Sequence, residues 1–430
     1  MDKQKKLFPK NFLWGASTAS HQVEGHNHNQ WTEWELSVAA QQAKTANKRL
    51  LWLPDWQKFR AQAETPKNYI SGRGIEHYKV YRHDLALLKK LNLNSLRFGI
   101  EWSRVEPEEG VWNKHEWEHY RNYIQAMIDL GIEPVLNIWH WTLPVWFAKK
   151  GGFAKRSNLA YFDKFVQQLC AELQIADLKY IITLNEPNVY ASFGYLTGEW
   201  PPNVKKPLQF MCVYYNLAVA HRRTYRYLKK SYKHLQIGIA PQLANIQAKR
   251  PHNILDQVVT WWMRYFWNWW FLNRIKNYQD FVGFNYYFTD YYQFLGIRSI
   301  IKGKFFTRAN PEVPKNDLGW YMEPEGIYPL MVRIWSHYKK PIIITENGVA
   351  DAQEEYRRWW IEESMISIER ALSEGIKVQG YLHWSLLDNF EWAYGWWPKF
   401  GLIAVDRENG MKRTIRPSAK WWATWLANRK

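Results

Sequence analysis

The sequence predicts an α/β protein, a single (β/α)8 TIM barrel domain that spans residues 1–430. Eight short runs rich in β-branched and aromatic residues recur along the chain, and amphipathic helical runs separate them. Strands that alternate with helices form parallel sheets, and eight such units over this length favour a closed barrel. The expected strands are residues 12–16, 95–100, 133–138, 180–184, 236–239, 281–287, 341–345 and 378–384.

The runs between the strands have the spacing of helices. Apolar residues three and four positions apart indicate helices around residues 78–88 and 162–173. Gly131 and Gly375 stand where two further helices should end. An open, doubly wound sheet is the alternative fold, but it usually carries a glycine-rich phosphate loop after its first strand. Gly15-Ala16-Ser17 is not such a loop, so the barrel is favoured.

Two segments fit the barrel pattern less well. Residues 37–74 are rich in Ala, Gln and Lys, and we expect a long, partly helical loop there. Residues 261–271 are dominated by Trp, Tyr and Phe, which permits an interfacial membrane helix. Because the polar side of that run has no basic stripe, we expect it to form a face of the barrel wall instead.

Composition and charge exclude several function classes. The chain has 28 Trp among 430 residues and a net charge of +18, but its Lys and Arg are scattered. No nucleic-acid-binding motif is present, so no nucleic-acid partner is expected. Cys170 and Cys212 lie in helix-like runs, and two buried free thiols are typical of a reducing, cytoplasmic compartment. No apolar run reaches the roughly 18 residues of a spanning helix, and the basic N-terminus makes a poor signal peptide.

Two glutamates end strands of the predicted barrel in similar settings. Glu186 follows Asn185 at the end of the fourth strand, and Glu346 precedes Asn347 at the end of the seventh. Strand ends carry the active sites of such barrels, and strands four and seven lie across the mouth from each other. Paired carboxylates in unequal surroundings are what glycosidic cleavage requires. The sequence therefore predicts a glycoside-cleaving site.

Nearly the whole chain resembles glycoside hydrolase family 1, the β-glucosidase and β-galactosidase family. The resemblance rests on many motifs in the family's order, with details at residues 20–25, 149–153 and 194–197 closer to archaeal-type members. The motifs are Phe12-Leu13-Trp14-Gly15, His21-Gln22-Val23-Glu24-Gly25, Arg97-Phe98-Gly99-Ile100-Glu101-Trp102-Ser103-Arg104, Trp139-His140-Trp141, Asn185-Glu186-Pro187, Gly283-Phe284-Asn285-Tyr286-Tyr287, Thr345-Glu346-Asn347-Gly348 and Trp384-Ser385-Leu386-Leu387-Asp388-Asn389-Phe390-Glu391-Trp392.

The resemblance implies a role for each catalytic residue. Glu186 is expected to be the general acid/base and Glu346 the nucleophile of a retaining, exo-acting β-glycosidase, with carboxyls about 5–5.5 Å apart. Asn185 should bond the sugar 2-hydroxyl. Arg97 and Tyr287 should hold Glu346 ionised, because a nearby cation and a hydrogen-bond donor both favour the anion.

The resemblance also implies a binding site for the non-reducing sugar of small β-glycosides or short oligosaccharides. The residues expected to bind its hydroxyls are Gln22, His140 and Glu391. Trp384 should give the ring an apolar platform with Trp392 at its edge, and Asn285, Trp141 and Phe400 are expected in the same subsite. These polar groups suit glucose, galactose, fucose or mannose alike. No metal or organic cofactor is expected, because no His, Cys or carboxylate cluster has ligand spacing.

Two other functions remain as alternatives. A 6-phospho-β-glycosidase of the same family is one, but Glu391 and Trp392 stand where the phosphate would bind. A carboxylate repels a phosphate of charge near −2. The other is a non-catalytic sugar-binding protein on the same barrel, against which the presence of both glutamates argues. Residues 236–280 are fewer than is usual in the family, which should shorten one wall of the cleft.

Overall fold

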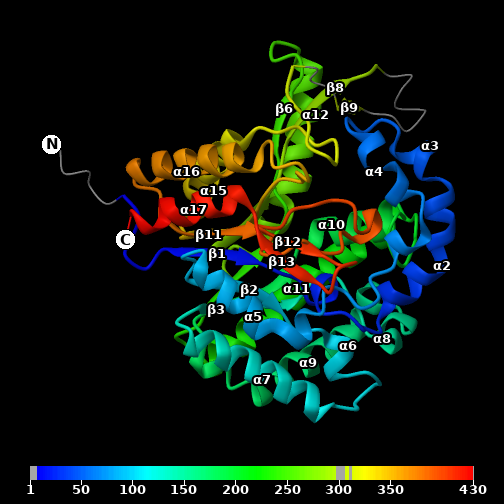
Figure 1. The fold of residues 1–430 in the computed structure, drawn as a ribbon. Coiled ribbons are helices and arrows are strands. Elements are labelled where there is room, and N and C mark those ends of the chain that lie inside the picture. The colour runs from blue at the N-terminus through cyan, green and yellow to red at the C-terminus, as the bar shows by residue number, and fades with distance from the viewer. Residues whose placement is uncertain (1–6, 297–305, 309–311, 430) are drawn as a thin grey trace.

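The computed structural model describes residues 7–296, 306–308 and 312–429. Eight parallel strands form one sheet in the order β5-β4-β3-β2-β1-β11-β10-β7, so the predicted barrel fold is confirmed (Figure 1). Each lies within two residues of an expected strand at either end. They are β1 (Leu13–Ser17), β2 (Ser95–Gly99), β3 (Glu133–Trp139), β4 (Tyr180–Asn185), β5 (Gln236–Ala240), β7 (Val282–Tyr286), β10 (Ile342–Asn347) and β11 (Val378–Trp384).

The first and last strands of this order meet and close the barrel. The Asp280 N–H donates to the Ile237 carbonyl at 2.7 Å, and the Asn285 N–H donates to the Pro241 carbonyl at 2.9 Å. Side chains from most of the strands fill the interior in one apolar cluster, so the barrel is a packed core rather than a pore. The cluster comprises Leu13, Val135, Tyr180, Ile182, Ala240, Phe281, Ile343 and Leu382.

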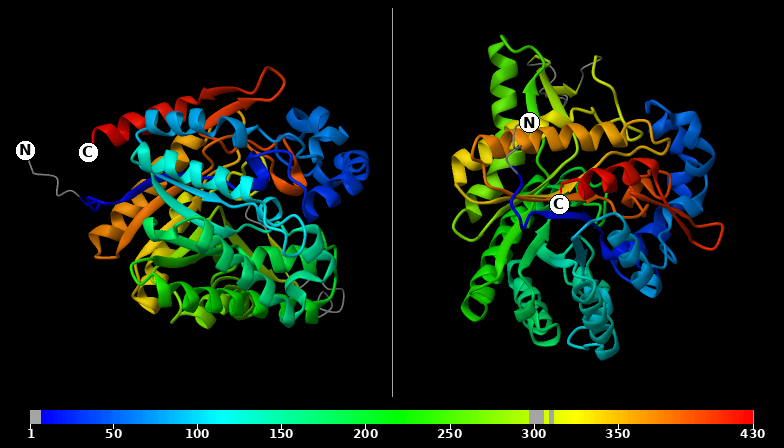
Figure 2. Two further views of the ribbon diagram at one scale, coloured as in Figure 1. Left: turned by 90° about the horizontal axis from the view of Figure 1, so that it is seen from below. Right: turned by 60° about the vertical axis from the view of Figure 1, so that its left-hand side comes forward.

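Helices surround the sheet and cover its outer face with a continuous apolar core (Figure 2). Their apolar residues recur at helical spacing, which turns one side of each helix toward the strands. The longer ones are α5 (His77–Lys90), α7 (Lys114–Asp129), α9 (Leu159–Glu172), α11 (Pro207–Ser231), α15 (Ile327–Tyr338), α16 (Arg357–Ser373) and α17 (Pro417–Ala427).

The segment after β1 is more helical than expected. Residues 37–74 contain the second half of α2 (Gln30–Lys44), α3 (Ala46–Leu50), α4 (Trp56–Ala63) and the short 3-10 helix η1 (Pro66–Tyr69). Its Ala-, Gln- and Lys-rich composition favours helix, and we underestimated that propensity. Leu50, Trp56 and Phe59 pack in one cluster with Trp384 and Phe400, so this segment supports the wall of the predicted sugar site.

The aromatic segment is only partly a barrel-wall face. Residues 261–271 cover the end of α12 (Ile254–Arg264), the π-helix η6 (Tyr265–Trp269) and the start of α13 (Trp270–Ile275). Trp270 and Phe271 are buried, as expected, but Trp261 and Trp262 are 59% and 49% exposed. The expectation is wrong for α12 because this helix packs on a small outlying sheet and projects from the barrel (Figures 1 and 2).

That small sheet was not predicted from the sequence. It consists of β6 (Asn245–Ala248), β8 (Thr289–Phe294) and β9 (Phe306–Arg308). The cysteines also differ from expectation, because Cys170 is buried whereas Cys212 is exposed on α11. The cytoplasmic location inferred from two buried thiols stays a prediction. Within the described residues, no helix has both the length and the apolar character needed to cross a bilayer.

Candidate active site

Glu186 is positioned by the sharp turn from β4 into α10 (Pro187–Ala191). Its backbone has a φ of +39°, and Pro187 occupies the first position of the helix. The Glu186 N–H is held by the Ala240 carbonyl at 2.8 Å, which ties the turn to the end of β5. The Glu186 side chain is 5% exposed and accepts a hydrogen bond from Asn285 Nδ2 at 2.7 Å.

Glu346 lies near the end of β10, and a cation and a hydroxyl bind its two oxygens. Arg97 Nη1 from β2 donates to Glu346 Oε1 in a buried ion pair. Tyr287 Oη donates to Glu346 Oε2 at 2.5 Å. Glu346 is 3% exposed and Arg97 is fully buried, so the pair is shielded from solvent and the attraction is strong.

The two carboxyls differ in their electrostatic surroundings. Burial raises the pKa of Glu186 well above its ordinary value, and the negative charge of Glu346 raises it further. Burial also raises the pKa of Glu346, but the Arg97 charge and the Tyr287 hydroxyl oppose that rise. Glu186 is therefore the carboxyl that holds its proton more tightly, and Glu346 is the one that ionises first.

A network of amides connects the two glutamates. Asn185 Oδ1 accepts from Arg97 Nη2 at 2.5 Å and from Asn285 Nδ2 at 3.1 Å. Asn285 Oδ1 accepts from Thr345 Oγ1 at 2.6 Å, so its amide is fixed at both ends. Sequence reasoning placed Asn285 against the sugar, whereas in the structure its amide hydrogen bonds go to Glu186 and Asn185 and orient the Glu186 carboxyl.

Gln22 and Glu391 approach each other from α1 (Ser20–Val23) and from the segment after β11. Gln22 Nε2 donates to Asn389 Oδ1 at 2.9 Å and to the Phe390 carbonyl at 2.7 Å. Within the described part of the chain, Gln22 Oε1 and Glu391 Oε2 are enclosed and have no hydrogen-bond partner. Because enclosed polar atoms are costly unless paired, these two oxygens indicate a polar ligand.

Glu391 is half-buried, and its carboxyl is strongly perturbed. Desolvation, followed by the charge of Glu346, raises the pKa of Glu391 to about 8, while hydrogen bonds from Trp384 and Gln22 oppose the rise. At neutral pH this carboxyl therefore carries a proton and can both donate to and accept from a hydroxyl. Glu391 therefore lies close enough to Glu346 for the charge of Glu346 to change its pKa.

Aromatic rings form one side of the site. Trp392 packs at centroid distances of 5.4 Å on His21, 5.9 Å on His140 and 4.7 Å on Trp141. Trp384, at the end of β11, lies 6.0 Å from His140. Trp141 also donates from Nε1 to the Asn185 carbonyl at 3.0 Å. The predicted aromatic residues thus lie together next to the predicted polar ones.

His140 is a neutral imidazole within this ring cluster. Burial, followed by the charge of Arg97, lowers the pKa of His140 well below its ordinary value. Its Nε2 lies 2.9 Å from Asn185 Nδ2, so the two side chains form one polar surface beside Glu186. Its Nδ1 lies 3.3 Å from Asn137 Nδ2, so both ring nitrogens have amide partners, and a sugar hydroxyl would have to replace one of them.

Phe400 completes the apolar wall, and one ring was missed by sequence reasoning. Phe400 is 2% exposed and lies edge-on to Tyr287 at 6.1 Å. Trp320 contacts both rings, at 5.6 Å from Tyr287 and 6.2 Å from Phe400, and is partly exposed. The only signal for Trp320 was its residue type, since it follows no predicted strand.

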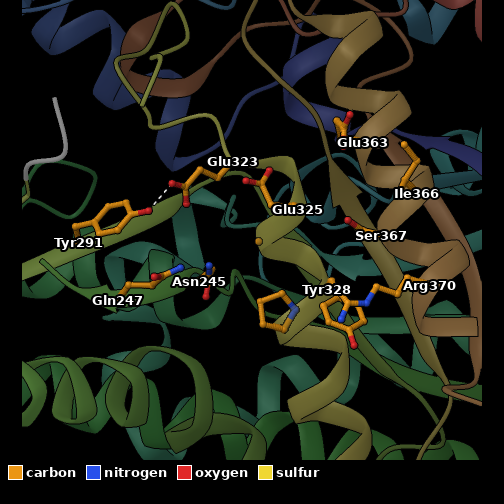
Figure 3. A pocket seen from close by; sticks show the side chains of 12 residues that line it. Asn245, Gln247, Tyr291, Glu323, Glu325, Tyr328, Glu363, Ile366, Ser367 and Arg370 are labelled. Carbon is orange, nitrogen blue, oxygen red and sulfur yellow. Dashed lines mark hydrogen bonds between the residues drawn. The ribbon is translucent and has the colours of Figure 1, made fainter. Parts of the chain in front are cut away.

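A cavity of about 510 Å³ lies away from these residues, between the small sheet and α16 (Figure 3). In it, Tyr291 donates to Glu323, and burial, followed by the neighbouring carboxylates, raises the pKa of Glu325. No residue predicted for catalysis or sugar binding lines it, and we do not assign it to the reaction. Its lining comprises Asn245, Gln247, Tyr291, Glu323, Glu325, Gly326, Tyr328, Pro329, Glu363, Ile366, Ser367 and Arg370.

Comparison with known proteins finds β-glycosidases that are similar to this chain over nearly its whole length. β-Glucosidase A of Thermotoga maritima is 30% identical over 98% of this chain and 98% of its own length. The solved β-glycosidase from Pyrococcus horikoshii superposes with a TM-score of 0.84 at 31% identity, covering 98% of this chain and 95% of that one. A family 1 β-glucosidase structure from Thermotoga maritima gives a TM-score of 0.86 at 26% identity, with 99% of both chains covered.

The family comparison agrees with the relatives. The model of glycosyl hydrolase family 1 matches residues 4–274 and 271–430, which together include every strand of the barrel and both strand-end glutamates. The chain therefore belongs to glycosyl hydrolase family 1.

Proposed function

We propose that this chain is a retaining, exo-acting β-glycosidase that removes terminal β-D-glycosyl residues such as glucose. The observation that carries this proposal is the opposed setting of two buried glutamates. Glu346 is bound by Arg97 and Tyr287, whereas Glu186 is held only by an amide and feels the charge of Glu346. A protonated acid beside an ionised nucleophile is the arrangement that glycoside cleavage with retention uses.

The first step forms a glycosyl-enzyme ester. A Glu346 oxygen attacks the anomeric carbon as the bond from that carbon to the leaving oxygen breaks, and the proton of Glu186 passes to the leaving oxygen. The released alcohol departs, and the sugar is held as an α-glycosyl ester. Losing the negative charge on Glu346 lowers the pKa of Glu186, since that charge had raised it.

The second step returns the enzyme to its starting state. Glu186, now ionised, takes a proton from water as the water oxygen attacks the anomeric carbon from the side that the alcohol left. The ester bond breaks and Glu346 regains its negative charge beside Arg97. Two displacements at one carbon restore the β-configuration.

Asn185 is suited to bind the 2-hydroxyl of the reacting sugar. Its Oδ1 is fixed by Arg97, the residue that also holds Glu346, so the amide keeps a set position relative to the nucleophile. A hydrogen bond to the 2-hydroxyl strengthens as the anomeric centre flattens. It therefore stabilises the transition state more than the bound substrate and lowers the activation barrier.

The remaining polar groups suit the outer hydroxyls of the sugar. Gln22 Oε1 and Glu391 Oε2 can receive vicinal hydroxyls, since within the described residues neither oxygen has a partner. A third hydroxyl would reach His140 by replacing Asn185 or Asn137 as its partner. The rings of Trp384 and Trp392 provide apolar surface for the carbon face of the sugar. The barrel interior below the site is packed, so a sugar chain cannot extend through it. A site closed at one end favours removal of one terminal sugar at a time.

A 6-phospho-β-glycosidase is disfavoured by the same groups. The Glu391 carboxyl would repel a phosphate dianion only above its raised pKa of about 8, so the stronger objection is steric. The Trp392 ring is packed against Trp31, His21 and Trp141, so little room is left for a phosphate group there.

The test is a panel of nitrophenyl glycosides assayed with the purified chain. We expect kcat/KM to be highest for a neutral β-glycoside and to fall to background for the α-anomer and for the 6-phosphate. A preference for the 6-phosphate would support the alternative activity. Binding of the sugar without release of nitrophenol from any β-glycoside would show a non-catalytic protein and contradict the proposal.

A further inference from the structure

One helix of this protein exposes a continuous apolar surface, which we name the α12 face. Its residues recur at intervals of three and four and so lie along one side of the helix. Trp261 is 59% exposed, Trp262 49% and Ile254 77%. Exposed apolar patches of this kind mark surfaces that meet a partner or a membrane. The α12 face comprises Ile254, Leu255, Val258, Trp261, Trp262 and Phe266.

The opposite side of α12 anchors the helix, so the α12 face is not needed to hold the fold together. Val259 and Met263 pack on Ile246 and Tyr292 of the small sheet. Arg264 Nε donates to the Ile246 carbonyl at 2.6 Å, which fixes the C-terminal end of the helix. The helix projects from the barrel together with that sheet (Figure 1).

The aromatic rings of the α12 face are ordered against one another. Trp262 stacks on Phe266 at 5.4 Å, and Trp261 stacks on Tyr265 at 6.1 Å. Rings that are already ordered lose little conformational freedom when they meet a partner. Trp in particular prefers the headgroup layer of a membrane, where its ring is buried and its N–H stays solvated.

Positive charge accompanies the α12 face. From Gln247 to Ile275 the chain has a single carboxylate, Asp256. Arg250 pairs with it, through Nε and Nη2 at 2.8 Å each, so no acidic charge remains uncompensated there. Lys249 is exposed just before α12 and Arg264 ends it, so the cations lie at the two ends rather than in a stripe.

We propose that the α12 face docks this protein reversibly on an anionic lipid bilayer. The net charge of +18 attracts anionic headgroups, and the exposed Trp, Leu and Ile side chains then enter the interface. A second copy of the chain is the other occupant that could cover an apolar face. It would bring two surfaces of the same strong charge together, which charge repulsion opposes. The proposal is independent of the glycosidase activity.

Vesicle flotation tests the proposal with the full chain. We expect the protein to float with vesicles of equal parts phosphatidylcholine and phosphatidylglycerol at low salt, and to float poorly with pure phosphatidylcholine. Replacing Trp261→Ser and Trp262→Ser together should weaken binding by roughly tenfold or more, because the apolar area buried at the interface is lost. Raising the salt should weaken the binding of the native protein.

Two controls make the result specific to the α12 face. Leu208→Ser removes an apolar side chain that is 84% exposed on α11 and should leave flotation unchanged. Hydrolysis of a soluble aryl glycoside by the double variant should match the native protein, which shows that it is folded. Equal flotation of native protein and double variant would overturn the proposal. So would a native dimer that the double substitution converts to a monomer.

Discussion

Arg97 and Glu346 form a buried ion pair that joins β2 to β10 across the barrel. The same guanidinium also donates to Asn185, so one cation fixes the nucleophile and an amide beside the acid/base. Removing one partner of a buried pair leaves an uncompensated charge, which costs roughly 3–5 kcal/mol. A substitution at either residue should therefore change both the position of the Glu346 carboxyl and the stability of the barrel.

Tyr287→Phe should lower kcat/KM and shift its dependence on pH. The Tyr287 hydroxyl donates to Glu346, and a hydrogen bond to a charged group contributes roughly 1.5–3 kcal/mol, or about 10- to 150-fold. Its loss raises the pKa of Glu346, so the acid limb of the kcat/KM profile should move to higher pH. Tyr286→Phe is the matched control, since Tyr286 donates to the Glu323 carbonyl instead. An acid limb unmoved by Tyr287→Phe would contradict the pairing.

The alkaline limb of the same profile should belong to Glu186. The pKa of this group is raised, so it loses its proton only as pH rises through that raised value. Activity should fall over that range because only the protonated carboxyl can donate. Glu186→Gln, assayed with a dinitrophenyl glycoside that needs little protonation, should show a flat alkaline side. If the fall in kcat/KM at alkaline pH persisted in the Glu186→Gln variant, a group other than Glu186 would be responsible for it.

Much of this arrangement could be predicted from the sequence. The eight strands are short apolar runs, and the segments between them have the residue spacing of helices. This alternation predicts a parallel barrel in which neighbouring strands follow one another along the chain. Glu186 and Glu346 were recognisable because each ends such a run beside an asparagine. The contacts of Arg97 and Tyr287 with Glu346 were implied by the family resemblance, and the structure shows both. The hydrogen bond from Asn285 to Glu186 was not expected, since it joins strands that are far apart in the sequence.

The errors have physical causes. Residues 37–74 were expected to form a long, partly helical loop, and their helical content was underestimated although Ala, Gln and Lys favour helix. Residues 261–271 were expected to form a face of the barrel wall because their polar side has no basic stripe, yet Trp261 and Trp262 are exposed. Whether an aromatic helix is covered depends on what lies beside it, and α12 packs on a small sheet of short strands that carries no clear sequence signal.

Glu391→Gln should weaken turnover of neutral glycosides. In the proposed function the Glu391 carboxyl bonds sugar hydroxyls, and the amide keeps its volume while changing its donors and acceptors. Leaving one buried hydroxyl poorly paired costs roughly 1–3 kcal/mol, or about 5- to 150-fold in kcat/KM. Glu325→Gln is the control, because Glu325 lines the cavity between the small sheet and α16. If kcat/KM of the Glu391 variant equalled that of the native enzyme, the sugar site would be misplaced.

The separate roles of Glu346 and Glu186 are the central claim, and one added nucleophile tests them together. Replacing Glu346→Gly removes the nucleophile, and azide can then attack from the vacated side. Replacing Glu186→Ala should let a dinitrophenyl glycoside form the glycosyl-enzyme, which accumulates because no base activates water. Azide then attacks that ester from the opposite face.

The direct measurement is NMR of the glycosyl azide that each variant forms from the same β-glycoside. We predict the α-azide from Glu346→Gly and the β-azide from Glu186→Ala, because the first reaction has one displacement and the second has two. The same anomer from both variants, or native-like turnover in either, would contradict the assignment of nucleophile and acid/base.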